Sequence, residues 1–260
     1  MSAIRPSYGQ DTSMEIVVLA NYGSEIFGVD QQTRAFVRFE VDYDQFAHLT
    51  FNPFALWKIR LSSDQVPADP SRPEFIEATE IIPTGQLHKK RTIALLAREC
   101  SSPTSIPILG FNGPSISYGQ ITGRSPSVTL IELTKRQAIR KNSYGEITIS
   151  FPWGQVIASL PIGNEAERQL FEHADRPLNS NKEVAYVLGF KPKYVVVGLA
   201  RPRAGYCRKM AMGLLPEKIS RKTAKALKTL QLDSASKDRG HNGTVDGTVF
   251  GDLEEDDSSQ

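Results

Sequence analysis

The sequence predicts an α+β protein rich in β-strands, in which mostly antiparallel strands form one large or two small β-sheet units. Short runs of β-branched and aromatic residues recur along the chain, which is the composition of buried and half-buried strands. Most connections between these runs are too short to hold a crossover helix, so antiparallel pairing is favoured. Two or three helices and a disordered C-terminal tail complete the predicted fold.

Five strands are predicted in an N-terminal half, residues 14–100, which follows a flexible polar arm at residues 1–13. They cover residues 15–20, 35–41, 51–61, 75–82 and 92–98. The last segment fits either a strand or a turn of helix, and its shortness favours a strand. Prolines and aspartates predict a loop over residues 62–73, and Pro83, Thr84 and Gly85 predict a turn.

Residues 101–127 contain four prolines, four glycines and seven serines. This composition is typical of a long surface loop or a linker between two halves of a chain. We therefore predict a boundary here between the N-terminal half and a C-terminal half that covers residues 128–232.

The C-terminal half is predicted to hold four strands and two helices before its basic end. The strands cover residues 128–133, 146–151, 155–160 and 194–199. The clearer helix runs from Glu165 to His173, because Asn164 is a good N-cap residue and Glu167 lies in the first turn. A second short helix is predicted at residues 182–188.

Composition indicates an ordinary soluble protein. Hydrophobic residues make up 40% of the chain and charged residues 23%, and no apolar run approaches the length of a membrane helix. Cys100 and Cys207 are far apart and lack metal-ligand spacing, so we expect neither a zinc site nor a disulfide framework. A cytoplasmic location is expected, with no cofactor, no bound metal and no membrane partner.

Charge is unevenly distributed along the chain. Residues 1–200 carry twenty basic and twenty acidic residues, whereas residues 201–228 carry nine Lys or Arg and a single acid, Glu217. Residues 229–260 hold two basic and eight acidic residues, and residues 233–260 are predicted to be a disordered acidic tail. A basic segment between a neutral body and an acidic tail favours a polyanionic partner.

The basic segment is predicted to contain an arginine loop and an amphipathic helix. Pro202 and Gly205 end a buried strand in a loop, and Pro216 and Glu217 are typical of the first turn of a helix. Guanidinium groups can bind phosphate with two hydrogen bonds, and lysines on a rigid helix contact a phosphate backbone. We therefore predict a nucleic-acid-binding protein, for DNA or RNA. The expected contact residues are Arg201, Arg203, Tyr206, Arg208, Lys209, Lys218, Arg221, Lys222, Lys225 and Lys228.

Further basic clusters could extend this surface if the fold brings them together. They lie at residues 88–91, at residues 135–136 and at residues 140–141. Tyr144, Trp153 and Tyr206 lie near them in the sequence and could stack on bases. Trp153 stands between Pro152 and Gly154, however, and such a residue is more often packed on its own hairpin.

Two alternatives to nucleic-acid binding remain open. In the first, Ile219, Leu227 and Leu230 of the same helix dock on a protein partner or on a second copy, so the chain is an assembly protein. In the second, the chain is a hydrolase whose site residues are dispersed, since no catalytic motif is found. Cys207 could have a lowered pKa beside Arg208, but a buried, inert thiol is the more common case.

Overall fold

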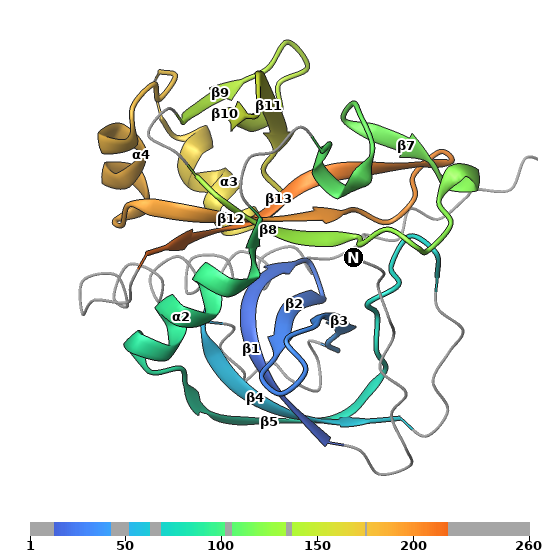
Figure 1. The fold of residues 1–260 in the computed structure, drawn as a ribbon. Helices are drawn as coiled ribbons and strands as arrows, with labels where there is room; N and C mark the ends of the chain where they lie inside the picture. The colour runs from blue at the N-terminus through green and yellow to red at the C-terminus, as the bar shows by residue number, and fades with distance from the viewer. Residues whose placement is uncertain are drawn as a thin grey trace, which may run out of the picture.

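The computed structural model describes residues 13–42, 52–62, 69–101, 106–133, 137–174 and 176–217. These residues confirm the predicted fold class, since they form several mostly antiparallel sheets and three α-helices. Figure 1 shows two sheet layers stacked on each other, with a smaller sheet and two helices above them. Among the strand pairs of the described residues, β6 with β8 is parallel and the other named pairs are antiparallel.

The first layer is a five-stranded sheet in the order β3-β2-β1-β4-β5. Its strands are β1 (Ser13–Tyr22), β2 (Glu25–Asp30), β3 (Phe36–Glu40), β4 (Ala55–Leu61) and β5 (Ala78–Gln86). The segment before β5 returns to the opposite edge, where Phe75 forms a parallel bridge with Arg38 of β3. Two backbone hydrogen bonds flank this bridge, from Arg38 N to Glu74 O at 3.0 Å and from Ile76 N to Arg38 O at 2.8 Å. The sheet therefore closes into a small barrel.

The alternation of apolar and polar residues that predicted these strands also determines which side chains fill the barrel interior. In β4, Trp57, Ile59 and Leu61 face inward and are buried, while Lys58 and Arg60 face outward and are exposed. The Trp57 ring packs against Phe39 of β3, with 6.2 Å between the ring centroids. Period-two burial of this kind is what holds each strand in a single register.

Three details of the predicted first half are wrong or were missed. Residues 92–98 lie in a helix, α2 (Lys89–Glu99), whose Leu95 and Leu96 pack in a hydrophobic cluster between the layers. Pro83 does not begin a turn but lies inside β5, opposite Trp57. A proline is tolerated there because β5 is an edge strand of its sheet and the register shifts beside it. Strand β2 was not predicted.

The second half forms another barrel with the same connectivity. Its strands are β8 (Val128–Glu132), β9 (Ala138–Lys141), β10 (Ile147–Trp153), β11 (Val156–Pro161), β12 (Pro192–Leu199) and β13 (Tyr206–Pro216). Segments β8 and β9 act as one interrupted first strand, because β8 pairs with β12 and β9 pairs with β10. The barrel closes where Ile162, just after β11, forms a parallel bridge with Ala211 of β13.

Two helices connect the third and fourth strands of this second barrel. Helix α3 (Glu165–Glu172) is capped as predicted, since the Asn164 side chain accepts a hydrogen bond from Glu167 N at 3.1 Å. Helix α4 (Asn181–Leu188) confirms the second predicted helix and ends at Gly189, whose φ is 74°. Phe171 and Leu188 pack these helices on the barrel core.

The segment between the barrels is built into the second one. It contains β6 (Cys100–Ser101), η1 (Ile108–Gly110), β7 (Ser115–Ser117) and η2 (Tyr118–Gln120). Strand β7 pairs with the start of β13, and Ile108 and Leu109 join the core of the second barrel. The domain boundary at residues 101–127 stays a prediction.

Strand β13 covers residues of the basic segment that were predicted to lie in a loop and at the start of a helix. It was not predicted, and it runs to Pro216, which pairs with Pro192 instead of starting a helix. The structure describes the chain to residue 217, so the predicted amphipathic helix lies outside the described residues. No helix in the described part of the chain is long and apolar enough to cross a membrane.

The outer face of β2 and β3 in the first barrel is buried against the second barrel. Arg38 lies at its centre, is fully buried and forms two hydrogen bonds with Glu25, at 3.0 and 2.8 Å. Its remaining hydrogen bonds reach the second half, to Ser127 Oγ and to Leu199 O, both at 2.8 Å. A buried arginine is tolerated here because its charge is paired and its donors are satisfied.

Candidate nucleic-acid interface

Two loops of the second barrel carry the exposed aromatic and basic residues of the predicted interface. One connects the first and second strands of the barrel, between β9 and β10, and the other connects the fourth and fifth strands, β12 and β13. We call residues 142–146 and 201–206, together with Arg208, the two-loop surface.

The loop between β9 and β10 is held by one asparagine side chain. Asn142 Oδ1 accepts hydrogen bonds from Tyr144 N and from Glu146 N, both at 2.9 Å. Gly145 has a φ of +82° and completes the turn. The loop fixed in this way presents Tyr144 at its tip, with 87% of the residue exposed.

The loop between β12 and β13 ends in a tight hairpin turn, as the sequence predicted a loop there. Arg203 and Tyr206 exchange two backbone hydrogen bonds, at 2.9 and 3.1 Å. Ala204 and Gly205 between them have φ values of 50° and 79°, which matches the twist of antiparallel strands. Arg203 is exposed and Tyr206 is 55% exposed, so a rigid turn presents both side chains to solvent.

An ion pair connects the two loops. Arg208, at the start of β13, donates hydrogen bonds to the two carboxylate oxygens of Glu146, at 2.7 and 3.0 Å. Hydrogen bonding from Arg208 lowers the pKa of Glu146, and the same hydrogen bond raises the pKa of Arg208. The fold thus brings together two loops that are about sixty residues apart in the sequence.

The five predicted contact residues that the structure describes differ in how they are placed. Arg203 has no ion pair or side-chain hydrogen bond with any described residue, and Tyr206 is exposed beside it. Arg201 pairs with Glu40 of the first barrel, and Arg208 pairs with Glu146. Lys209 is 4% exposed. Lys218, Arg221, Lys222, Lys225 and Lys228 lie outside the described residues.

Lys209 and its neighbour Cys207 point into the second barrel. The Lys209 ammonium donates to the carbonyl of Phe111 and lies 3.8 Å from the centre of the Phe111 ring. Burial lowers the pKa of Lys209 to about 8. Burial also raises the pKa of the Cys207 thiol, so the expectation of an inert thiol fits better than a reactive one. Neither residue can reach a ligand on the two-loop surface.

The sheet between the loops offers an open face. Ser150 of β10 is half-buried, Ser159 of β11 is exposed and their hydroxyls are hydrogen-bonded at 3.1 Å. Ile157 is 67% exposed, and sequence analysis did not identify this residue. Trp153 is packed inward, with its indole N–H bonded to Ile106 O at 2.9 Å, so its interpretation as a hairpin corner is the better one.

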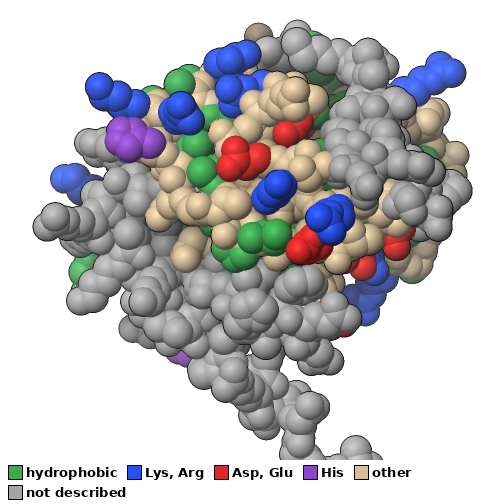
Figure 2. Space-filling view, turned by 90° about the horizontal axis from the view of Figure 1, so that it is seen from below, with side chains coloured by type: hydrophobic (Ala, Val, Ile, Leu, Met, Phe, Trp, Pro, Cys, Tyr) green, Lys and Arg blue, Asp and Glu red, His purple; other side chains and the backbone are tan. Residues whose placement is uncertain are grey.

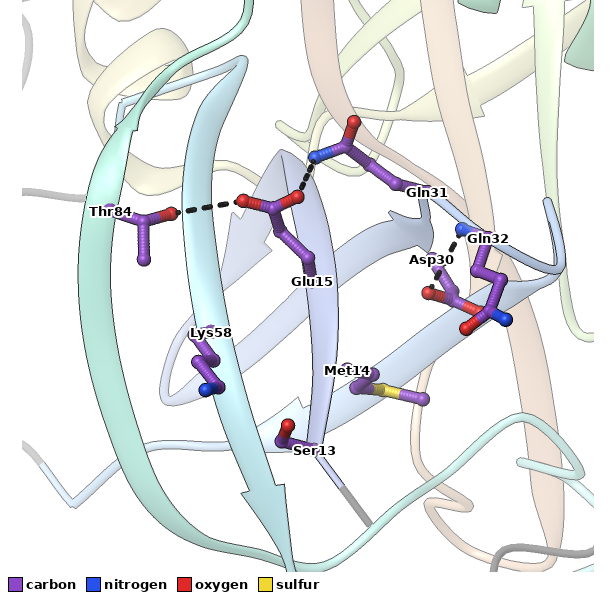
Figure 3. A pocket seen from close by; sticks show the side chains of 8 residues that line it. All are labelled: Ser13, Met14, Glu15, Asp30, Gln31, Gln32, Lys58 and Thr84. Carbon is purple, nitrogen blue, oxygen red and sulfur yellow. Dashed lines mark hydrogen bonds between the residues drawn. The ribbon is translucent and has the colours of Figure 1, made fainter.

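A polar pocket on the first barrel is a second candidate (Figure 3). It has a volume of about 460 Å³ and is lined by Ser13, Met14, Glu15, Asp30, Gln31, Gln32, Lys58 and Thr84. The Glu15 carboxylate points toward Gln31 Nε2 at 2.7 Å and Thr84 Oγ1 at 3.4 Å. Protein groups therefore already bind the Glu15 carboxylate, which makes this pocket a weaker candidate than the two-loop surface.

Comparisons with known proteins add little to this geometry. No family model matches the chain, and no curated protein sequence matches it. One similar solved structure is the crystal structure of the tetrameric p202 HIN2, with 9% sequence identity and a TM-score of 0.29. The match covers 82% of this chain and 98% of that chain. A likeness at this level indicates neither fold nor function.

Proposed function

We propose that the protein binds nucleic acid on the second barrel, across the two-loop surface and the outer face of β10 and β11. The observation that carries this proposal is the strand connectivity. A five-stranded Greek-key barrel of this kind is an OB-fold, and OB-folds bind oligonucleotides on strands 2 and 3 with the loops between strands 1 and 2 and strands 4 and 5. In the second barrel, strands 2 and 3 are β10 and β11, and the two connecting loops are those of the two-loop surface.

The first barrel cannot use the equivalent face, because Arg38 and Phe27 on it are fully buried against the second barrel. A fold alone does not imply a function, so the proposal depends on the side chains that the open face presents. Tyr144 and Tyr206 offer exposed rings, and base stacking on such rings tolerates any sequence. Arg203 and the exposed Lys141 supply charge for the phosphates.

Replacing Tyr144 by alanine is expected to weaken binding of single-stranded DNA or RNA by about 5- to 150-fold, since one stacked base contributes roughly 1–3 kcal/mol. Arg203→Ala should also reduce the slope of log affinity against log salt by about 0.7, for one lost phosphate contact. Fluorescence anisotropy with labelled single strands of about eight nucleotides, within the site size of one barrel, measures both effects.

Matched controls lie on α4, outside the two-loop surface. Tyr186 is 90% exposed, so Tyr186→Ala removes an equally exposed ring, and Lys182→Ala removes an exposed charge. Neither control should change affinity by more than about twofold. Unchanged affinity in both Tyr144→Ala and Arg203→Ala, or an equal loss in the controls, would rule out this surface as the binding site.

A further inference from the structure

Helix α2 carries a basic stripe that the two-loop surface does not include. Lys90, Arg91 and Arg98 are exposed on it, and two exposed alanines, Ala94 and Ala97, lie between them. These positions fall at i, i+1, i+4, i+7 and i+8, so they share one face of the helix. The stripe is about 12 Å long at the rise of an α-helix, and its small residues leave the cations accessible from the side.

The first turn of α2 is an unfavourable place for cations. Basic residues there oppose the positive end of the helix dipole, and the first turn contains no acidic residue to offset them. Lys90 and Arg91 form no ion pair with any described residue, and the nearest acid on the helix is Glu99 in its last turn. The helix is nevertheless fixed, since Leu95 and Leu96 on its other side are buried.

Helix α2 lies far from the two-loop surface. In Figure 1 it flanks the lower sheet at one side, whereas the turn between β12 and β13 lies at the opposite side. Figure 2 views the molecule from the side of β4 and β5 and shows Lys and Arg side chains gathered near a histidine at one edge. Leu215 near the end of β13 belongs to the same hydrophobic cluster as Leu95 and Leu96 of α2.

Lys90 and Arg91 have no structural role in the described contacts, and their position in the first turn weakens the helix. Cations that make no described contact and that are unfavourable for their own helix are expected where a phosphate backbone binds.

We propose that α2 is a second phosphate-contacting surface, which holds the strand of a longer nucleic acid whose other part occupies the two-loop surface. This inference rests on the proposed function. It assigns Lys90, Arg91 and Arg98 to backbone contacts that carry no sequence information. Because the two surfaces are apart, short oligonucleotides occupy one of them and long oligonucleotides gain from both.

The test is the double substitution Lys90→Glu and Arg91→Glu in the full chain. Acidic residues in the first turn of a helix are favourable, so the melting temperature should stay the same or rise, and lost binding cannot then result from unfolding. Affinity for a single strand of about thirty nucleotides, roughly twice the largest site of one barrel, should fall at least about tenfold. The salt slope should decrease by about 1.4 for two lost contacts.

The eight-nucleotide probe separates this inference from the proposed function. Its affinity should be unchanged in the α2 variant and reduced in Tyr144→Ala. The charge-matched control, Lys182→Glu with Lys191→Glu, changes two exposed lysines, one of them in the first turn of α4, and should leave the affinity for the long strand unchanged. An unchanged affinity for the long strand in the α2 variant, or an equal loss for both lengths, would overturn the two-surface model. Unchanged affinity for the eight-nucleotide probe in both Tyr144→Ala and Arg203→Ala would overturn the proposed function instead.

Discussion

Replacing Arg38 by methionine is expected to destabilise the protein by about 3–5 kcal/mol, because the substitution leaves a buried carboxylate without its main partner. Glu25 is 2% exposed, and both of its oxygens accept hydrogen bonds from Arg38. Arg72 also pairs with Glu25, at 3.6 Å, but it lies closer to Glu40, at 2.9 Å, so we expect it to compensate for only part of the lost guanidinium. Urea unfolding followed by tryptophan fluorescence would measure the change, since Trp57 is in the first barrel and Trp153 in the second.

Two further variants distinguish a buried pair from an ordinary surface pair. The double variant Arg38→Met with Glu25→Met removes both charges and should recover much of the lost stability. Arg60→Met breaks the exposed pair with Glu80, whose side chains are 60% and 44% exposed, and should change stability by less than about 1 kcal/mol. A loss in Arg38→Met no larger than that in Arg60→Met would contradict the assigned role of Arg38.

Loss of Arg38 should also reveal how the barrels depend on each other. Ser127 and Leu199 O receive hydrogen bonds from Arg38, and Ser127 also donates to Glu74. Burial raises the pKa of Glu74, so this group is neutralised more easily than a surface carboxylate. The contact between the barrels is therefore a polar network within apolar packing, and one substitution in it affects both halves.

The sequence was informative where local pattern and packing agree. Alternation in β4 predicted which side chains enter the first barrel, and Asn164 predicted the start of α3. Sequence patterns gave wrong or missing elements where the burial of a side chain depends on the rest of the fold, as in α2 and β13. The run TIALLA in α2 resembles a strand, and burial of Leu95 and Leu96 on one side decides for a helix. In β13, two adjacent cations conceal the alternation, because Lys209 points inward to Phe111 while Arg208 points outward to Glu146.

The candidate site was predictable as a set of loops but not as a surface. Pro202 and Gly205 marked the arginine loop, and Tyr144 was identified as a possible stacking residue close to basic residues. That these loops adjoin depends on barrel closure, which pairs Ile162 with Ala211 across many residues of intervening chain. Local sequence patterns do not encode such long-range pairs. The ion pairs of Arg201 and Arg208 are equally long-range, so the local count of Lys and Arg at residues 201–228 overstated the number of free cations among the described residues.

Replacing Glu167 by glutamine is expected to stabilise the protein at pH 8 by roughly 2–4 kcal/mol, since a pKa shift of one unit corresponds to about 1.4 kcal/mol. Glu167 is 6% exposed in α3, and burial raises its pKa to about 8. One carboxyl oxygen accepts a hydrogen bond from Leu214 N at 2.8 Å, and the other has no hydrogen-bond partner among the described residues. Glutamine keeps the acceptor and cannot become charged.

The sign of the pH dependence follows from the protons bound in each state. Below a pH of about 4.5 both the folded and the unfolded chain hold the proton, so the carboxyl has no pH-dependent effect. Between about 4.5 and 8 the folded chain holds the proton and the unfolded chain does not, so stability falls as pH rises. The advantage of Glu167→Gln should therefore be small near pH 4.5, grow through neutral pH and level off above pH 8.

Urea unfolding of both proteins from pH 4.5 to 9 would measure this advantage, with Glu165→Gln as the control. Glu165 lies in the same first turn of α3, but its side chain is 52% exposed and pairs with Arg168, so its replacement should change stability by less than about 1 kcal/mol at every pH. A difference between Glu167→Gln and the unchanged protein that stays constant across this range would mean that the carboxyl ionises normally in the folded state. A difference that rises with pH would identify Glu167 as a protonated carboxylic acid held inside the second barrel.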